Sequence, residues 1–570
     1  MGELMIEDMR NAIEDGPTLS FFRFSGFATA ADVRYDGARF YSLDPDNPNP
    51  SAVCVNDQGR FVRLSECQAE EIVDLTGSVV IPGFIEGHGH LMGFGQSLTN
   101  LDLSGAESLQ ALVDDVAQAI DEAEPGDWIL GRGWHQSKWS KTPKLIKGFQ
   151  TNETLNQVSP ENPVYLVHAS GHAAFANDKA LELAGVTGRT QVAGDGEIIL
   201  DASGKPTGIL NEVAQALVEP IIPRDSAEQR ERQLQLALQA LAANGITSFH
   251  DAGATDADIA LYQAFLAAGA MTTRVYVMIT GSDPEMLAGW MRRGPLIGAG
   301  DQRLTVRSLK LVADGALGSR GAWLIEPYTD RPGHIGLPTL PIADIIDISH
   351  LAYRNGFQVA VHAIGDRANR EVLDVFDALF DGRDRGVRYR VEHAQHIDPV
   401  DIPRFAQLGI IPSVQGIHMS SDRPWAIDRL GQKRIEQGAY MWRDLIDTGA
   451  ILVNGTDVPV EPVNPFASFY ALVTRQTLAG DPEGGFEPGQ KISRAEALRA
   501  YTLNAAYAAF EEQEKGSLSP GKLADFVVLD RDIMTIPADE ILATRVLTTY
   551  VSGQVVYQYP QTEALVKVER

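Results

Sequence analysis

Short runs of apolar, mostly β-branched residues recur along the middle of the chain. Each run is followed by a polar stretch and then by a segment with helical periodicity. Such continuous apolar runs are typical of strands buried on both faces of a parallel sheet. Segment 227–245 shows the helical pattern and ends on Gly245, a common C-cap residue. The eight apolar runs are residues 79–90, 246–253, 273–280, 308–316, 357–366, 389–395, 410–416 and 450–457.

Eight buried strands that alternate with helices are what a (β/α)8 barrel requires. We therefore predict an α/β fold with a TIM barrel over residues 83–512. Residues 100–240 do not fit this count, because they hold helices and a further strand-like piece, PVYLVHASGH. We interpret them as a long insertion after the first barrel strand that covers the barrel mouth.

The two ends of the chain share a different pattern of short strands and turns. Residues 57–59 (DQG) and the pair Ser552-Gly553 each separate two apolar runs, as hairpin turns do. Neither end is long enough to bury a good core alone. We expect residues 21–82 and 513–570 to form one composite β-sandwich domain, preceded by a loose leader at residues 1–20.

Composition and charge exclude several classes of protein. Of the 570 residues, 44% are apolar, which suffices for a large core and excludes disorder as the main state. Acidic residues outnumber basic ones by 76 to 48, a net charge of −28. This balance argues against binding nucleic acid, and against binding anionic lipid through a basic patch. No apolar run approaches the roughly 18 residues that cross a bilayer.

The cysteines and the first residues bear on the compartment. Cys54 and Cys67 are the two cysteines of the chain, too few for a disulfide framework and not in a CxxC pair. Such usage is typical of a reducing compartment. The N-terminal sequence has acids where a signal peptide carries positive charge, and it has no apolar h-region. We predict a cytoplasmic protein.

Histidines gather at the ends of the predicted strands. His88 and His90 close the first run, His250 the second, His362 the fifth and His393 the sixth. The fourth run contains Lys310 and the eighth ends at Asp457. The carboxyl ends of parallel barrel strands lie on one face, where catalytic residues gather. These residues, far apart in sequence, are therefore expected to converge.

His88-Gly89-His90 can form a metal site, because residues i and i+2 of a strand point the same way. An HxH pair alone is more often two surface or satisfied core histidines, and a lone strand-end histidine is usually a hydrogen-bonded core residue. Two further histidines and a carboxylate on other strands weaken this alternative. Lys310, between Leu309 and Leu311, either pairs with Asp314 or another acid, or has a lowered pKa and becomes a carbamate.

Several motifs together resemble the amidohydrolase superfamily. They are PGFIEGHGH (82–90), Lys310, VHAIGD (361–366), EHAQ (392–395) and NGTDVPV (454–460). Further motifs resemble the branch of N-substituted formamide deformylases, amidohydrolase family 3. These are GRGWHQSKW (131–139), SGHAAFANDKAL (170–181), TSFHDAG (247–253), LKLVADGALGSRGAWL (309–324) and GSLSPGKLADFVVLD (516–530). The resemblance extends from about residue 35 to 557.

The resemblance implies two metal sites. One would use His88, His90 and Asp457, the other His362 and His393, with carbamylated Lys310 as the bridge. Imidazole and carboxylate ligands suit Zn²⁺, and Mn²⁺, Fe²⁺ and Co²⁺ are also chemically suitable. Such a pair of ions lowers the pKa of a shared water. Asp457 is the expected general base, which takes the water's proton and passes it to the leaving nitrogen; the alternative is a purely structural ligand.

Other residues are candidates for supporting roles, each with a structural alternative. His172 either hydrogen-bonds the substrate carbonyl or holds the fold. Trp134 and Trp139 either line an apolar substrate wall or are simply packed. Glu392 is expected to be structural, because strand alternation points it away from His393. The remaining candidates are Arg320 and Asp314 for a polar substrate group, and His250, Asp251 and Asp366 as residues that orient the ligands.

We therefore expect a metal-dependent hydrolase of a non-peptide C–N (amide) bond in a small or mid-sized, partly apolar substrate. The same site could cleave a lactone, an ester or a phosphotriester, and a non-catalytic sensor or scaffold is the alternative of another class. A deaminase fits less well, because that chemistry usually uses one metal and no lysine bridge. The expected partner is a small molecule, and the resemblance suggests a homodimer.

Overall fold

The computed structural model describes residues 32–136, 139–141, 143–168, 173–192, 196–560 and 568–569. Among these residues, 94–236 form one compact unit, and 32–93 with 237–569 form the other. Helices α2 (Leu91–Thr99) and α6 (Ala227–Ala243) run across these limits. The predicted leader, residues 1–20, lies outside the described residues.

The larger unit contains a sheet of nine described strands, eight of which are parallel and nearly closed into a barrel. The ninth, β16 (Leu296–Gly298), pairs antiparallel with β17 outside this path. The barrel strands pair in sequence order, so each of the eight predicted runs is confirmed as a barrel strand. The strands are β7 (Phe84–Gly89), β14 (Ile246–Ala254), β15 (Arg274–Thr280), β17 (Leu304–Val312), β18 (Gln358–Ala363), β19 (Arg390–His393), β20 (Ile411–Gln415) and β21 (Val453–Gly455).

The first and last strands meet at their carboxyl ends. The amide of Asp457 donates to the carbonyl of His88 at 2.8 Å, and the amide of His90 donates to the carbonyl of Val458, also at 2.8 Å. These two bonds place the residues that follow β21 beside the end of β7. The ends of the chain's most distant barrel strands are thereby brought together.

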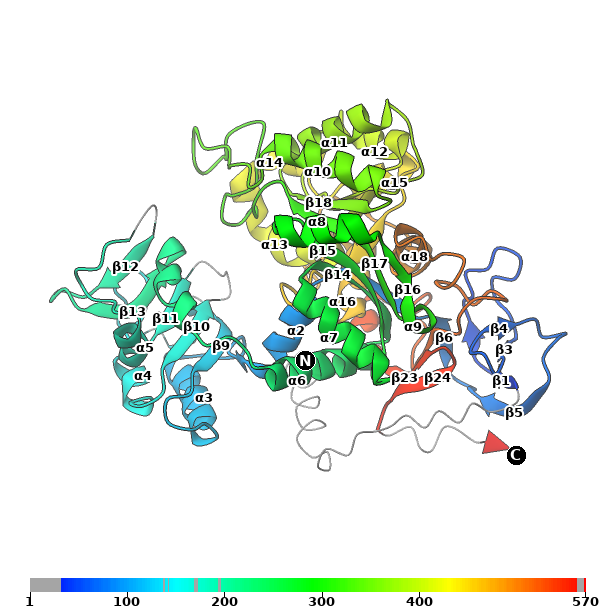
Figure 1. The fold of residues 1–570 in the computed structure, drawn as a ribbon, viewed down its shortest axis with the longest axis horizontal. Helices are drawn as coiled ribbons and strands as arrows, with labels where there is room; N and C mark the ends of the chain where they lie inside the picture. The colour runs from blue at the N-terminus through cyan, green and yellow to red at the C-terminus, as the bar shows by residue number, and fades with distance from the viewer. Residues whose placement is uncertain are drawn as a thin grey trace. The chain divides into compact units, whose positions relative to one another are not determined.

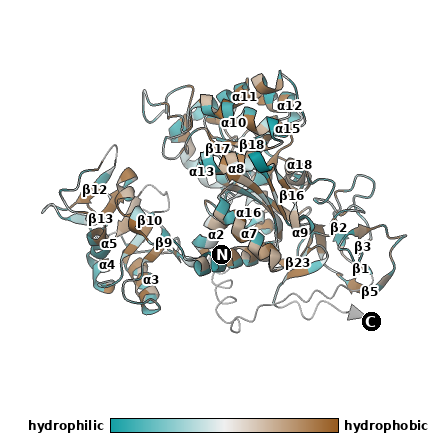
Figure 2. Cartoon of the chain, viewed as in Figure 1, coloured by the Kyte–Doolittle hydropathy of each residue, from teal (hydrophilic) through white to brown (hydrophobic). Residues whose placement is uncertain are grey.

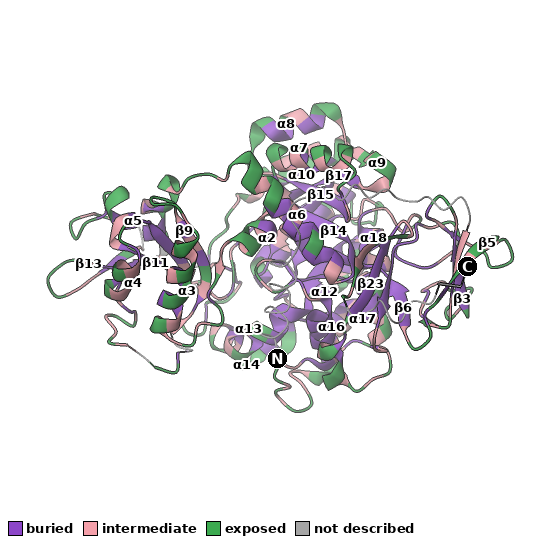
Figure 3. Ribbon diagram, turned by 90° about the horizontal axis from the view of Figure 1, so that it is seen from below, coloured by how far each residue is buried: buried purple, intermediate pink, exposed green. Residues whose placement is uncertain are grey.

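Helices lie outside the barrel strands (Figure 1). In α11, the buried residues Ala368, Val372, Val375 and Phe376 recur at helical spacing and face the strands. Figure 2 shows hydrophobic residues along the strands, and Figure 3 shows that the outer helices carry the exposed positions. The helices are α7 (Asp256–Ala267), α8 (Pro284–Arg293), α10 (Ile342–Arg354), α11 (Asp366–Phe380), α12 (Ile402–Leu408), α13 (Gly416–Leu430), α14 (Gln432–Gly438), α15 (Trp442–Asp447), α16 (Pro465–Thr474), α17 (Arg494–Ala500) and α18 (Leu503–Ala508).

Strands from both ends of the chain form two further sheets in this unit, ordered β25-β5-β1-β3-β4 and β2-β6-β22-β23-β24. Both predicted hairpins are confirmed, because β3 pairs antiparallel with β4 and β23 with β24. The strands are β1 (Asp32–Asp36), β2 (Arg39–Phe40), β3 (Ala52–Val55), β4 (Phe61–Val62), β5 (Ala69–Asp74), β6 (Val79–Pro82), β22 (Phe526–Leu529), β23 (Val546–Val551), β24 (Gln554–Gln558) and β25 (Val568–Glu569).

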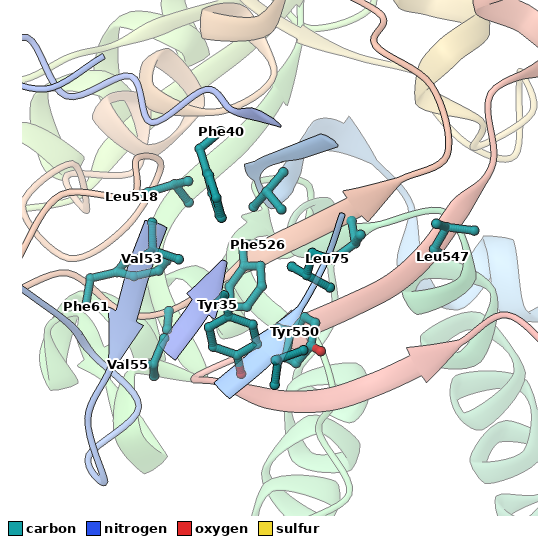
Figure 4. Packing of buried hydrophobic residues seen from close by; sticks show 14 residues of the cluster. Tyr35, Phe40, Val53, Val55, Phe61, Leu75, Leu518, Phe526, Leu547 and Tyr550 are labelled. Carbon is teal, nitrogen blue, oxygen red and sulfur yellow. The ribbon is translucent and has the colours of Figure 1, made fainter. Parts of the chain in front are cut away.

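The two terminal sheets share one hydrophobic cluster (Figure 4). The rings of Phe526 and Tyr550 stack with centroids 4.2 Å apart, and Tyr35 meets Phe526 edge-on at 5.1 Å. Tyr35 comes from the first strand and the other two from the last fifty residues. The hydrophobic core therefore joins the two ends of the chain.

The two cysteines are paired in the sheet that contains β3. Cys54 and Cys67 form a disulfide, with their Cα atoms 6.0 Å apart. Nothing in the sequence indicated this pairing, and the expectation of a reducing compartment did not anticipate a disulfide. Cytoplasmic localisation stays a prediction. No helix among the described residues is both long and apolar enough to cross a membrane.

The smaller unit has its own six-stranded sheet, ordered β12-β13-β11-β10-β9-β8. The strand-like piece noted in the sequence is confirmed as β10. Its elements are β8 (Leu101–Asp102), β9 (Ile129–Trp134), β10 (Val164–His168), β11 (Ala173–Ala176), β12 (Glu197–Leu200), β13 (Pro206–Asn211), α3 (Leu109–Asp121), α4 (Glu153–Val158) and α5 (Asp178–Leu183).

A buried ion pair connects the barrel to the terminal sheets. The guanidinium of Arg274, at the start of β15, donates through Nε and Nη2 to the carboxylate of Asp525 at 2.7 and 2.9 Å. It also donates to Ser552 Oγ at 2.7 Å. Although burial alone would raise it, the pKa of Asp525 is held below its ordinary value by Arg274. The pair therefore stays charged at neutral pH and weakens only in acid, as the carboxylate is protonated.

Arg274→Ala is expected to destabilise the protein by about 3–5 kcal/mol, because it leaves the Asp525 charge buried without a partner. The measurement is the urea unfolding midpoint by circular dichroism at pH 7. Arg293→Ala removes an exposed arginine, 3.7 Å from Asp256, and is the matched control with an expected change of less than about 1 kcal/mol. Equal midpoints for the two variants would contradict the role given to Arg274.

Candidate metal centre

The six residues expected to hold metal lie at the carboxyl ends of the barrel strands. Two are at the end of β7, three are on β17, β18 and β19, and the last follows β21. All six belong to the larger unit. They are His88, His90, Lys310, His362, His393 and Asp457.

The HxH motif and the carboxylate form a compact group. Asp457 Oδ1 lies 3.1 Å from His90 Nε2 and 3.4 Å from His88 Nε2. The three potential ligand atoms all lie within 4.8 Å of one another. Gly89 is required between the histidines, because an added Cβ would lie 2.6 Å from the ring of Phe249. The sequence thus places two imidazoles and one carboxylate around one point.

Hydrogen bonds on the far side of each ring orient the imidazoles. His90 Nδ1 donates to the carbonyl of Ala252 at 2.7 Å, and His393 Nδ1 donates to Gln415 Oε1 at 2.8 Å. His88 Nδ1 lies 2.6 Å from Glu392 Oε2. Since an acceptor occupies each Nδ1, the Nε2 lone pair of the neutral ring is the one available to a metal ion.

Lys310 lies inside this group rather than beside an acid. Its Nζ is 3.1 Å from His88 Nε2, and no carboxylate among the described residues forms an ion pair with it. Burial lowers the pKa of Lys310, while the charges of Glu392 and Asp457 oppose that shift. The ion pair with Asp314 that the sequence left open is not formed. A lowered pKa favours the neutral amine.

His362 and His393 lie side by side on β18 and β19, with ring centroids 4.4 Å apart. Burial and the nearby charge of Lys310 lower the pKa of His362 to about 3. Burial also lowers the pKa of His393 well below its ordinary value. Both rings are therefore neutral at pH 7, which is the form that binds a metal ion.

Two residues of the site have strained backbones. His393 has φ +75° and Asp457 has φ +60°, in the left-handed region that non-glycine residues rarely adopt. Such strain persists where the surrounding structure over-determines it, and it is concentrated at functional sites. Here it turns both side chains at the point where their strands end.

These residues fit a divalent metal ion. The donors are the imidazole nitrogens of His88, His362 and His393, whose pKa values burial lowers, and of His90, whose pKa the nearby Asp457 raises despite burial. The fifth donor is the Asp457 carboxylate, whose pKa is held well below its ordinary value, against the effect of burial, by His90 and the neighbouring imidazoles. His362 Nε2 and His418 Nε2 are buried, and no hydrogen bond to another described residue satisfies them. Buried polar atoms without partners are costly, so a bound cation explains their retention.

The structure adds residues that the sequence interpretation missed. His418, in the first turn of α13, brings its Nε2 to 4.0 Å from Asp457 Oδ2. A signal was available, because His418 follows the seventh apolar run by two residues. Glu392 does point away from His393, but that direction leads into the barrel, where it holds His88. It therefore contacts one of the expected ligands, which strand alternation alone did not indicate.

Arg390 forms a buried ion pair with Glu392. Its Nε lies 2.6 Å from Glu392 Oε1, and its Nη1 is 3.0 Å from His250 Nδ1. Despite burial, the pKa of Glu392 is held far below its ordinary value by Arg390 and His88. His250, expected to orient a ligand, contacts Arg390 and the backbone of Gly87, the residue that precedes His88.

Two other candidates for orienting residues differ in their contacts. Asp251 accepts the amide of Leu91 at 2.9 Å and so fixes the chain just after His90. Asp366, expected beside His362, instead accepts the amide of Ile325 at 2.8 Å and lies 3.4 Å from His396 Nε2. Local hydrogen bonds at the start of α11 thus engage Asp366 away from His362.

The candidates for substrate binding are largely engaged elsewhere. Trp134 and Trp139 are 0% and 5% exposed and belong to the hydrophobic core of the smaller unit, so packing, the alternative, describes them. The two tryptophans therefore no longer support the expectation of a partly apolar substrate. Arg320 forms a bidentate pair with Asp330, and His172 lies outside the described residues.

Asp314, the other candidate for a polar substrate group, is fully buried. Its carboxylate accepts the amides of Ile364, Gly365 and Trp323 at 2.8–3.0 Å. Burial raises its pKa to about 7. Its Oδ1 lies 3.5 Å from His362 Nε2, so it borders the metal centre and ties two loops together there.

Glu392→Gln is expected to weaken metal binding by about 10- to 100-fold, because outer partners of ligating histidines fix ring orientation and basicity. The measurement is titration of the metal-free protein with Zn²⁺. Glu371→Gln changes an exposed pair with Arg367 on α11 and is the matched control. Unchanged affinity in Glu392→Gln would show that the Glu392 charge does not support the site.

Comparisons with known proteins agree with this geometry. The family model described as "Amidohydrolase family" matches residues 71–557. The chain is 34% identical to Protein LONG AFTER FAR-RED 3 of Arabidopsis thaliana, over 85% of this chain and 83% of that protein. It is 30% identical to N-substituted formamide deformylase of Arthrobacter pascens, over 92% and 98%.

A solved structure is also similar. An uncharacterized metal-dependent hydrolase from Pyrococcus horikoshii superposes with a TM-score of 0.72 at 28% identity, covering 89% of this chain and 99% of that one. This chain likewise has a nearly closed parallel barrel with candidate metal-binding histidines and an aspartate at its carboxyl end. The chain belongs to the amidohydrolase family, as the resemblance predicted.

Proposed function

We propose that the protein is a metal-dependent hydrolase that cleaves a non-peptide C–N bond, an amide, of a small or mid-sized substrate. The observation that carries this proposal is the convergence of four neutral or hydrogen-bonded imidazoles, Lys310 and Asp457 at one end of the barrel. The deformylase of Arthrobacter pascens, similar along nearly its whole length, supports the choice of a C–N bond.

We further propose that the centre holds two divalent ions, with Zn²⁺ as the first choice and Mn²⁺, Fe²⁺ or Co²⁺ as alternatives. His88, His90 and Asp457 would hold one ion, and His362 and His393 the other. Lys310 would bridge them as a carbamate formed from CO₂, which its buried, readily neutralised amine favours. When bound, the ions supply Lewis acidity, which activates water and polarises the scissile carbonyl.

Asp457 is the residue of the chain that would transfer the proton. The Asp457 carboxylate is ionised at neutral pH, since the hydrogen bond from His90 and nearby imidazoles hold its pKa low. It can therefore accept a proton from the attacking water and later deliver it to the leaving nitrogen. Glu392, Gln415 and the carbonyl of Ala252 hold the imidazoles in fixed orientations, so that little reorganisation is needed.

A panel of substrates tests the bond that is cleaved. The metal-loaded protein is assayed with N-acyl amines, including N-substituted formamides, and with lactones, carboxylic esters and aryl phosphotriesters. We expect the highest kcat/KM with an N-acyl amine. A preference for a lactone, ester or phosphotriester would replace the proposed substrate class. Near-zero metal content together with no hydrolysis would favour a non-catalytic sensor or scaffold.

The remaining expectations are also proposals. The shared cluster of Tyr35, Phe526 and Tyr550 supports a composite β-sandwich domain built from both ends of the chain. The acidic charge supports a small-molecule partner over nucleic acid or a membrane surface. A homodimer is proposed from the family resemblance, and its mass in solution can be measured by light scattering.

A further inference from the structure

A histidine outside the expected ligand set faces the metal centre. His418 lies in the first turn of α13, directly after β20, and is 8% exposed. Its Nε2 lies 4.0 Å from Asp457 Oδ2, and its ring is parallel to that of His393, with an interplanar angle of 10° and centroids 6.1 Å apart. Helix α13 thus places an imidazole beside His393, at the end of β19, and Asp457, which follows β21.

We propose that His418 is a metal ligand, which together with His393 and Asp457 holds one ion of the centre. This inference rests on the proposed function. The ligand atoms of His393, His418 and Asp457 all lie within 4.8 Å of one another, as do those of His88, His90 and Asp457. In tetrahedral zinc sites, ligand nitrogens and oxygens lie about 3.4 Å apart, so a small inward movement suffices.

The two carboxylate oxygens of Asp457 face different histidines. Oδ1 faces His88 and His90 at 3.4 and 3.1 Å, whereas Oδ2 faces His418. A carboxylate placed in this way can contribute one oxygen to each of two ions. The structure therefore contains two histidine groups that share Asp457, one at the end of β7 and one between β19 and α13.

The described surroundings of His418 leave its buried Nε2 without a hydrogen-bond partner. A buried nitrogen without a partner is unfavourable, so an imidazole kept only for packing would be better replaced by an apolar side chain. The assignment also bears on His362, whose Nε2 lies 3.5 Å from Asp314 Oδ1. His418 would add a third imidazole to the ion for which His362, His393 and the bridging Lys310 were expected.

Metal binding without turnover tests the assignment. The full-length chain is stripped with a chelator and titrated with Zn²⁺ or Co²⁺, and bound ions are counted by mass spectrometry. We expect wild type to bind two ions. His418→Ala and His418→Gln should bind one of them about 100-fold or more weakly, since ligand loss exceeds the effect of an outer partner. The visible bands of bound Co²⁺ should change in the same variants.

The matched control is His350→Ala, which removes an exposed imidazole from α10 and should leave both ions in place. His418→Gln keeps the length of the side chain, and circular dichroism reports whether each variant is folded. If both His418 variants retain two ions with wild-type affinity and an unchanged Co²⁺ spectrum, the assignment is overturned. A raised KM with intact metal binding would likewise overturn it, in favour of a substrate contact. If wild type itself binds no ion, the proposed function fails as well.

Discussion

Asp457→Asn is expected to lower kcat by about 10²- to 10⁴-fold, the range that general acid–base catalysis contributes. Most of the bound metal should be retained, because Asn keeps one oxygen at nearly the same position. The amide of residue 457 still donates to the carbonyl of His88, so the backbone should not move. What the variant loses is a group that can accept a proton.

Two measurements separate a proton carrier from a structural ligand. kcat is determined with the best substrate of the panel, and metal content is determined on the same sample. The control, Asp347→Asn, changes an exposed carboxylate on α10 and should match wild type in both. An unchanged kcat would refute proton transfer by Asp457. A loss of kcat that follows a loss of metal would mean that Asp457 acts as a ligand only.

The barrel and the convergence of the six expected ligands could be predicted because two regular patterns coincide. Strands buried on both faces appear as apolar runs, and parallel strands in sequence order place all their carboxyl ends together. Residues that end such runs, such as His90 and Asp457, are thereby placed at the mouth, whereas the assignment of the six residues as ligands came from the family resemblance. The structure confirmed all eight strands.

These patterns did not predict which residues each side chain contacts. Strand alternation correctly predicted that the side chain of Glu392 points away from that of His393. It did not indicate the neighbours of Glu392, because side chains from several strands fill the interior of the barrel. There Glu392 contacts Arg390 and His88. His418 was missed because it lies in a helix after the strand end, where period-2 alternation no longer applies.

The packing of the tryptophans and the pairing of the cysteines could not be decided from the sequence, for a different reason. A tryptophan in a sheet looks the same in sequence whether its face is covered or open, and Trp134 is covered by the core of its unit. Cys54 and Cys67 are 13 residues apart, and only the tertiary arrangement places their Cα atoms within bonding range. In both cases the deciding fact is a contact between segments that local patterns do not encode.

Lys310→Ala is expected to abolish activity and to release at least one metal ion. The lysine Nζ lies 3.1 Å from His88 Nε2, in the midst of the imidazoles. A cationic amine there would repel a metal ion, whereas a carbamate would attract it. Formation of the carbamate joins the neutral amine to the carbon of CO₂ and releases one proton. Burial, which lowers the pKa of Lys310, makes that neutral amine available.

Chemical rescue tests whether a negative group is what the site needs. Removing the side chain beyond Cβ leaves space in which acetate or propionate can place a carboxylate near His88. We expect either acid, or bicarbonate, to restore part of the activity and of the metal content to Lys310→Ala, but to leave wild type unchanged. Lys433→Ala, at an exposed position of α14, is the control and should need no rescue.

A direct readout accompanies the rescue. Wild type incubated with ¹³C-labelled bicarbonate should show a bound carbamate carbon by NMR, and Lys310→Ala should not. If the variant keeps two ions and full activity, Lys310 does not bridge them. If it loses both and no carboxylic acid restores either, the lysine serves as an amine, and the charge between the two histidine groups must come from Asp457 alone. The rescue therefore distinguishes a bridging anion from a buried amine that only orders the imidazoles.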